Sequence, residues 1–346
     1  MRIFSYRNKR LVRRAGLIAL AVVLGILALI VCRIIYLGRF VTYDDAGAHL
    51  DYAQHLTASR APAAPASTPE GDFSFDTVLD SSEEDTTGQQ ASRLSGYYIS
   101  TTMLASGLDE VRAALSQSDD YNAILLDVKS VFGSFYYSTS ITGAAKATVL
   151  DVTQVDQLIA ELAQKKGVTL IARVPAFSDP EYALKHQSQA LPLSSGALWT
   201  DENDCYWLNP YSNDVQGYLT SIALELADLG FDEVLFDNFY FPDSDRISWT
   251  GSVTKQEAIL DAADNLSANL LNQSIRLCLG TDDPEVAAYA GRVFITTNNA
   301  SQIDADTAAL SDALSDTSSQ IVYLTDSRDT RFEACGVLHP LLDETN

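Results

Sequence analysis

GFDEVLFDNFYFP, residues 230–242, is the stretch of this 346-residue chain that is most informative about its fold. A helical pattern precedes it, and after a Gly-Phe turn a short apolar run ends in Asp237. Side chains alternate between the two faces of a strand, so Glu233, Leu235 and Asp237 should share one face. A strand that follows a helix and ends in a carboxylate is typical of a parallel barrel, in which catalytic acids lie at the C-terminal rim.

Short apolar runs alternate with amphipathic helical patterns over residues 94–346, which predicts a parallel sheet and a (β/α)8 TIM barrel. Seven runs are typical of strands: 96–101, 122–128, 168–174, 232–238, 275–280, 292–297 and 320–325. Helical patterns lie at 107–117, 153–166, 213–229, 255–272, 283–290 and 304–315, with Thr153 as the expected cap of the second. An eighth strand near 335–339 has a weak signal, which leaves open a barrel that is irregular or incomplete at the last strand.

The N-terminal segment predicts a membrane anchor. Residues 1–14 are basic, and 18 uncharged, mostly apolar residues follow from Ala15 to Cys32. A run of this length can cross a bilayer, and an Arg33 side chain that reaches the interface extends the span to 15–37. A cleaved signal peptide is the alternative, but it would have a shorter apolar region and a small-residue cleavage site. The basic flank favours a single-pass protein of the cell membrane, with 1–14 cytoplasmic and the C-terminal domain extracellular.

Residues 38–93 predict a flexible extracellular stalk, because they are rich in Ala, Pro, Ser, Thr and acidic residues and offer little to bury. One short helix is expected within this stalk, over residues 43–56. The folded domain then occupies residues 94–346, which is the usual size of one TIM barrel.

The net charge of the chain is positive before the end of the predicted membrane span and strongly negative after it. Eight of the 23 Lys and Arg residues lie in 1–39, and all 46 Asp and Glu residues follow residue 43. The rest of the chain therefore carries 15 basic and 46 acidic residues, a net charge of −31. This balance argues against nucleic acid or an anionic polymer as the main ligand.

Histidines and cysteines show no metal-ligand spacing, so neither a metal nor a cofactor is expected. The histidines are scattered at His49, His55, His186 and His339. Cys205, Cys278 and Cys335 lie far apart and are expected to be buried thiols, with a single disulfide as the alternative.

Two long loops follow predicted strands, at 129–152 and 175–212, and both are rich in aromatic residues. Loops at strand C-termini carry the sites of such barrels, and exposed rings can stack on the C–H faces of sugars. We expect Trp199 and Trp207 to bind sugar in this way, with Tyr97 as a further sugar-binding ring. The alternative is that these rings only pack the loops down.

Four motifs together resemble a known family: LLDVKSVFG (125–133), LIARVPAFSDP (170–180), LWTDENDCYWLNPYS (198–212) and GFDEVLFDNFYFP (230–242). In order and spacing, residues 94–300 resemble the bacterial "putative glycoside hydrolase" domain family, TIM barrels distantly similar to alpha-amylase-type glycosidases. Family members more typically have Tyr and Arg where this chain has Asn238 and Tyr240, and Asp-Pro where it has Asn209-Pro210. The resemblance implies a barrel that acts on carbohydrate.

Glycoside hydrolysis ordinarily needs two carboxyl groups. Asp237 is the natural nucleophile or base. For the second group, Asp282 or Asp283 follows the fifth strand, where related barrels keep their acid, and Asp326 and Asp201 are further options. Glu233 shares the face of Asp237 but lies about 13 Å deeper, at about 3.3 Å per residue, and is expected in the barrel floor.

The ends of the second and third strands add Asp127, Lys129 and Arg173 to the candidates. Asp127 is a candidate catalytic acid, and Arg173, Lys129, Asn238 and Asp201 are candidate substrate-binding residues. If Asp127 and Arg173 face inward, they should pair beside Asp237, and this pairing should lower the pKa of Asp127. The alternative is an interior salt bridge that only fixes the upper layer of the barrel.

Two functions remain open. The first is a membrane-anchored glycoside hydrolase that acts on a cell-wall or exported polysaccharide, with Asp237 as nucleophile or base. The second is a catalytically inactive barrel that binds glycan or an envelope partner. The first predicts a second carboxyl about 5–10 Å from Asp237, and the second predicts an Asp237 that is alone or neutralised by a basic group.

Overall fold

The computed structural model describes residues 41–44, 47–50, 92–118 and 120–342. Contacts divide the chain into two units, residues 1–82 and 83–346. In the first unit, β1 (Val41–Asp44) pairs antiparallel with β2 (Gly47–Leu50). The helix expected over 43–56 is therefore wrong for the residues of this hairpin, because they pair as strands.

The predicted segments 1–14 and 15–37 lie outside the described residues, as does most of the predicted stalk. Within the described part of the chain, no helix is both long and apolar enough to span a bilayer.

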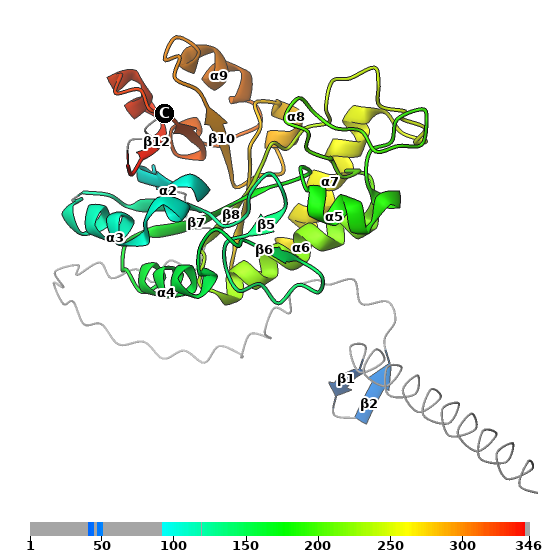
Figure 1. Ribbon diagram of the computed structural model, residues 1–346, viewed down its shortest axis with the longest axis horizontal. Helices are drawn as coiled ribbons and strands as arrows, with labels where there is room; N and C mark the ends of the chain where they lie inside the picture. The colour runs from blue at the N-terminus through cyan, green and yellow to red at the C-terminus, as the bar shows by residue number, and fades with distance from the viewer. Residues whose placement is uncertain (1–40, 45–46, 51–91, 119, 343–346) are drawn as a thin grey trace, which may run out of the picture. The chain divides into compact units, whose positions relative to one another are not determined.

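Eight parallel strands of the second unit close into a barrel (Figure 1). Around the barrel they are β3 (Ser95–Ile99), β4 (Ala123–Asp127), β7 (Thr169–Pro175), β8 (Glu233–Asp237), β9 (Arg276–Leu279), β10 (Arg292–Thr296), β11 (Ile321–Leu324) and β12 (Gly336–Pro340). The weak eighth strand is β12, which pairs with β11 and β3 and completes the ring. The (β/α)8 prediction is confirmed, and the barrel is closed.

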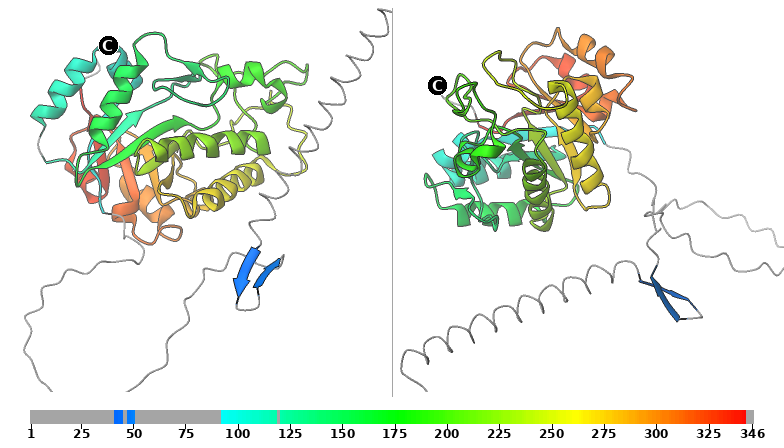
Figure 2. Two further views of the ribbon diagram at one scale, coloured as in Figure 1. Left: turned by 90° about the horizontal axis from the view of Figure 1, so that it is seen from below. Right: turned by 90° about the vertical axis from the view of Figure 1, so that its right-hand side faces the viewer.

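Helices follow the strands on the outside of the barrel. They are α2 (Thr101–Ser106), α3 (Leu108–Gln117), α4 (Val152–Leu162), α5 (Pro180–Lys185), α6 (Asn213–Asp228), α7 (Lys255–Leu270), α8 (Pro284–Ala287), α9 (Ile303–Leu310) and α10 (Thr317–Gln320), with 3-10 turns at Gln187–Gln189 and Thr330–Ala334. The longest two, α6 and α7, lie side by side along the barrel (Figure 2). The cap of α4 is Asp151, not Thr153: its side chain accepts a hydrogen bond from the Thr153 backbone N–H.

The sequence around β8 folds as its pattern predicts. The turn that ends α6 is Gly230, whose φ of 92° lies in the left-handed region that favours glycine. Leu235 then points into the barrel, where it belongs to the interior cluster of Leu125, Ile171, Cys278 and other buried side chains. Val234 and Phe236 point to the opposite side and pack in the larger core that includes the helices.

Glu233 lies in the floor of the barrel, as its depth along β8 predicts. Its carboxylate accepts a hydrogen bond from Arg276 Nη1 at 2.6 Å and from Arg292 Nε at 3.0 Å. Arg292 also donates to the backbone carbonyl of Ser319. Because both arginines neutralise Glu233, the floor holds a satisfied ionic cluster with a structural role.

The described cysteines are free and buried, as expected. Cys278 lies in the barrel interior, where its thiol donates to Glu233 Oε2 at 3.3 Å. Cys205 and Cys335 are buried outside this interior cluster.

Candidate active site at the C-terminal rim

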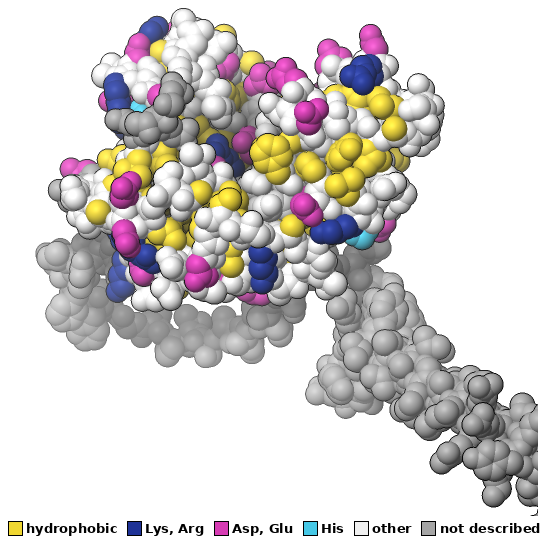
Figure 3. All heavy atoms as spheres, in the orientation of Figure 1, with side chains coloured by type: hydrophobic (Ala, Val, Ile, Leu, Met, Phe, Trp, Pro, Cys, Tyr) yellow, Lys and Arg dark blue, Asp and Glu magenta, His cyan; other side chains and the backbone are white. Residues whose placement is uncertain are grey.

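The C-terminal ends of β4, β7 and β8 enclose a cavity of about 460 Å³. Asp127, Arg173 and Asp237 line it together, and the 129–152 loop supplies one wall with Val131 and Phe132. Figure 3 shows a hollow near the middle of the view in which acidic and basic side chains meet. This rim is where parallel barrels place their sites.

Arg173 connects the two carboxylates of the cavity. Its Nε donates to Asp127 Oδ1 at 2.5 Å and its Nη2 donates to Asp127 Oδ2 at 2.7 Å, a bidentate pair across β4 and β7. Its Nη1 lies 3.9 Å from Asp237 Oδ2. The pairing of Asp127 and Arg173 beside Asp237 is therefore confirmed.

The pairing acts on Asp127 in the expected direction, because Arg173 lowers the pKa of this carboxyl group. Burial, which is the largest effect, and the charge of Asp237 raise the pKa, and the net result lies above the ordinary value, so the expected net lowering is wrong. For Arg173 itself, burial is the largest effect and lowers the pKa, but the charges of Asp127 and Asp237 and the hydrogen bonds to Asp127 together outweigh it, and the pKa is raised. The arginine thus stays charged, while Asp127 takes up a proton more readily than an exposed aspartate.

The two carboxyl groups lie close enough to act on one bond. Both contact the same guanidinium, at 2.7 Å for Asp127 and 3.9 Å for Asp237. Their nearest oxygens are therefore separated by no more than roughly 9 Å, which does not exceed the largest separation of glycosidase carboxyl pairs. Asp237 is the more accessible acid, with 26% of its side chain exposed against 11% for Asp127.

Close backbone approach fixes Asp237 at the end of β8. A Cβ on Gly280 would lie 2.5 Å from Asp237 Oδ1, so only glycine fits at the end of the neighbouring strand. Asn238 follows with a φ of 54°, and its backbone N–H donates to Asp237 Oδ1 at 2.9 Å. Asn238 therefore contributes a backbone turn and a donor that orients the carboxylate.

Lys129 lines the same cavity, but its side chain is almost fully buried. Its Nζ lies 3.0 Å from Asp179 Oδ2, and Tyr218 donates its hydroxyl to the same oxygen at 2.9 Å. This buried pair joins the loop after β4 to the start of α5. Lys129 thus holds the cavity wall and presents little surface to a substrate.

Tyr98, not Tyr97, faces the site. Tyr97 packs against Tyr121 with ring centroids 5.9 Å apart. Tyr98 joins the barrel interior, lies 5.9 Å from the Arg173 guanidinium and donates its hydroxyl to Asp326 Oδ1 at 2.8 Å. The sequence gives no signal that separates these two tyrosines, because neighbouring strand residues point to opposite faces and either ring fits either face; the pairing of β3 with β4 decides.

The two tryptophans expected to stack on sugar are buried. Trp199 is 6% exposed and Trp207 is 4% exposed, and their rings pack edge to face. Trp207 Nε1 donates to Asp201 Oδ2 at 2.9 Å, and Asp201 also accepts from the Cys205 backbone N–H. These residues hold the 175–212 loop together, as in the alternative that the sequence left open. Tyr240 is an exposed ring on this side, and it rests against Trp207.

Asp282 is not part of the cavity. Its side chain is exposed beyond β9, where its charge acts on Asp306 of α9. The structure therefore groups Asp237 with Asp127 and leaves Asp282 apart. Among the described residues, no three His, Cys, Asp or Glu side chains are arranged to hold a metal ion.

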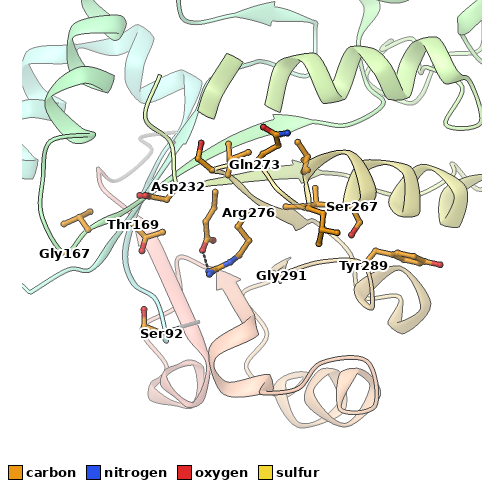
Figure 4. Close-up of a pocket in the computed structure, with 16 residues that line it drawn as sticks. Ser92, Gly167, Thr169, Asp232, Ser267, Gln273, Arg276, Tyr289 and Gly291 are labelled. Carbon is orange, nitrogen blue, oxygen red and sulfur yellow. Dashed lines mark hydrogen bonds and ion pairs between the residues drawn. The ribbon is translucent and has the colours of Figure 1, made fainter. Parts of the chain in front are cut away.

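A larger cavity, of about 760 Å³, opens at the N-terminal ends of β7, β8 and β9 (Figure 4). Arg276 projects into it while paired with Glu233, and Asp232 and Thr169 stand at its edge. Arg276 and Glu233 already neutralise each other here, and this end of a barrel serves stability. We therefore place the candidate site at the smaller cavity.

Comparison with protein families gives one match. Residues 96–280, slightly more than half of the chain, match the family model described as "Putative glycosyl hydrolase domain". The matched segment contains Asp127, Arg173 and Asp237. None of the curated proteins matches the chain.

Solved structures with a similar arrangement include a hypothetical protein from Ruminiclostridium thermocellum, at 26% identity over 52% of this chain and 96% of that chain, with a TM-score of 0.44. Ega3 from Aspergillus fumigatus, in complex with galactosamine, has 14% identity over 71% of this chain and 82% of its own, with a TM-score of 0.45. The glycoside hydrolase domain of PelA from Pseudomonas aeruginosa has 16% identity over 68% and 84%, with a TM-score of 0.42.

Proposed function

Because the chain belongs to the "Putative glycosyl hydrolase domain" family, we propose that its barrel hydrolyses glycosidic bonds of a polysaccharide. Asp237 is the nucleophile or base, and Asp127 is the second carboxyl group. The observation that carries this proposal is the cluster at the rim, in which one guanidinium contacts both acids at the end of a cavity.

The two acids differ in the way that such a pair requires. Burial raises the pKa of Asp127, which favours the protonated form that a general acid needs. Asp237 is more exposed and is held by the Asn238 backbone N–H, which suits a carboxylate that attacks sugar or activates water. Arg173 stands between them and would stabilise negative charge on either acid.

A second function is favoured by one specific feature. Arg173 occupies both oxygens of Asp127, so this acid must leave a bidentate pair before it can give up a proton. A barrel that binds glycan without cleaving it would retain such a pair to accept sugar hydroxyls. The competing function is therefore a glycan-binding protein of the envelope.

The test is an assay of the full-length protein and its Asp237→Asn and Asp127→Asn variants on soluble polysaccharides, with reducing ends and polymer binding measured in parallel. We expect Asp237→Asn to lower the release of reducing ends by at least about a hundredfold while binding persists. Asp264→Asn, an exposed aspartate of α7, is the matched control. Binding without any Asp237-dependent release would favour the glycan-binding function.

The location of this activity is part of the proposal. The apolar run at 15–37 and its basic flank support a membrane-anchored protein with the barrel outside the cell. The net charge of −31 after residue 39 favours neutral or cationic polysaccharide over anionic polymers. A cell-wall or exported polysaccharide meets both conditions.

A further inference from the structure

Exposed aromatic rings stand beside the candidate site on two different loops. Phe132 is 58% exposed and lines the cavity together with Asp237. Tyr240 is 49% exposed and lies three residues beyond Asp237. Burial and the carboxylates of Asp201 and Asp237 raise the pKa of Tyr240, in keeping with a hydroxyl at this rim.

The two rings flank the reactive groups around the rim. Phe132 comes from the loop after β4, and Tyr240 comes from the loop after β8. Strand β7, which carries Arg173, lies between β4 and β8 in the barrel. A chain that crosses the rim from one loop to the other therefore passes over Arg173 and Asp237.

Neighbouring structure holds the Tyr240 ring and the backbone of the turn that carries Phe132. Tyr240 packs on Trp207 with ring centroids 5.2 Å apart, and Trp207 is itself fixed by its hydrogen bond to Asp201. The turn that carries Phe132 is closed by the Gly133 N–H to the Ser130 carbonyl at 3.0 Å. It is also tied to the next loop by the Ser178 hydroxyl, which donates to the Val131 carbonyl at 2.9 Å.

The aromatic surface continues past Tyr240. Phe241 packs edge to face on Trp249 at 5.1 Å, and Trp249 packs on Tyr211 at 6.5 Å. Tyr211 is 37% exposed, and Trp249 is partly exposed. This side of the rim can therefore contact more than one sugar unit.

We propose that the cleft binds sugar units on both sides of the bond to be cleaved, with Phe132 on one side and Tyr240 on the other, so that the protein cuts within a polysaccharide chain rather than at its end. This inference rests on the proposed glycosidase function. A rigid ring binds the apolar face of a sugar at little entropic cost. Separate rings divided by a charged cavity are unlike the contiguous apolar core of a protein interface.

The experiment uses the full-length protein with dextran, pullulan, barley β-glucan and glycol chitosan. Product sizes are followed by size-exclusion chromatography from the earliest time points. Polymer binding is measured in the Asp237→Asn background, with Phe132→Ala and Tyr240→Ala added one at a time. Leu271→Ala, which removes a 76% exposed side chain at the other end of the barrel, is the matched control.

We expect long fragments first, and polymer binding about tenfold weaker in each ring variant than in the control, which corresponds to about 1.4 kcal/mol. Unchanged melting temperatures would show that the exposed rings do not support the fold. Mono- or disaccharides as the first products, or polymer binding in the ring variants that equals that of the control, would overturn the inference of internal cleavage. If release still depends on Asp237 in that case, the proposed hydrolase function is retained. Ring-dependent binding without release would instead overturn the hydrolase and with it internal cleavage. No binding and no release on any polymer would overturn both.

Discussion

Arg173 places one positive charge between two carboxylates that would otherwise repel each other in a partly buried cavity. The Nε and Nη2 atoms of the guanidinium donate to Asp127, and its Nη1 atom lies 3.9 Å from Asp237. Removal of one partner from a buried pair leaves an uncompensated charge, which typically costs about 3–5 kcal/mol. The cluster therefore supports the barrel rim as well as the proposed chemistry, and variants must be judged on both.

The protonation of Asp127 gives a prediction at this scale. Burial raises its pKa above the ordinary 3.8 despite the effect of Arg173. Because the pKa of Asp127 is higher in the folded protein than in the unfolded chain, its protonated form adds to the free energy of unfolding. This contribution is fully present below the pKa of the unfolded chain and is lost as pH rises through the pKa of the folded protein. Wild type should therefore lose stability relative to Asp127→Asn as pH rises from about 4, in urea unfolding at a series of pH values.

The same series with Asp264→Asn should run parallel to wild type, because that aspartate is exposed. If wild type instead gains stability over Asp127→Asn with rising pH, Arg173 outweighs burial. Asp127 would then be an acceptor of sugar hydroxyls rather than a proton donor.

At the scale of elements, the 129–152 loop depends on one glutamate of α6. Glu225 accepts hydrogen bonds from the Tyr137 and Thr139 hydroxyls at 2.7 Å and from the Ser140 hydroxyl at 2.6 Å. Burial works to raise the pKa of Glu225, but the hydrogen bonds from Ser140, Thr139 and Tyr137 outweigh it and lower the pKa. The wall that carries Phe132 is thereby fastened to a long, well-packed helix.

Glu225→Ala should loosen this loop without unfolding the barrel. Four donors lose their acceptor, because the Ser140 backbone N–H also donates to Glu225. The two buried ones, the Tyr137 and Thr139 hydroxyls, each cost about 1–3 kcal/mol when left unsatisfied. Hydrogen exchange should accelerate over residues 134–147, and limited proteolysis should cut there first. Because the folded pKa is lowered, the contribution of Glu225 is present above its ordinary pKa of 4.5 and is lost as pH falls through the folded value. Wild type should therefore approach the variant in acid.

Glu110→Ala, an exposed glutamate of α3, should leave exchange in this loop unchanged. Equal exchange rates in wild type and Glu225→Ala at neutral pH would contradict the assigned role.

Sequence patterns predict which face of a strand points inward where burial imposes a regular alternation of side chains. They predict it poorly where the pairing with a neighbouring strand decides which face points inward. Leu235 and Asp237 fall on the inward face of β8 because alternation leaves one choice. In β3 two neighbouring tyrosines fit either face, and only the pairing with β4 selects Tyr98 over Tyr97. Trp207 is buried by backbone pairing to Ser178 across a long loop, a contact without local signal.

The whole barrel has two ends with different chemistry. At the floor, Glu233 is neutralised by two arginines, whereas at the rim a single arginine serves both Asp127 and Asp237. The sequence already indicates this division, because Glu233 and Asp237 lie on one face of β8 at different depths. The partners of each acid come from β4, β7, β9 and β10 and are set by the closed barrel, and Asp282, exposed beyond β9, lies apart from them.

We expect the apolar run at 15–37 to attach the barrel to a membrane. The apolar run at 15–37 is long enough to cross a bilayer, and a charge at the centre of such a helix costs about 2.5–3.5 kcal/mol. The full-length protein should stay in the membrane fraction after a carbonate wash, and Leu24→Arg with Leu27→Arg should shift it to the soluble fraction. Leu271→Arg, on the exposed end of α7, should not. Protease added to intact cells should reach the barrel. Release of the wild-type protein by carbonate, or a mature N-terminus after residue 32, would contradict the anchor and favour a cleaved signal peptide. Only an uncleaved segment keeps residues 1–14 joined to the barrel.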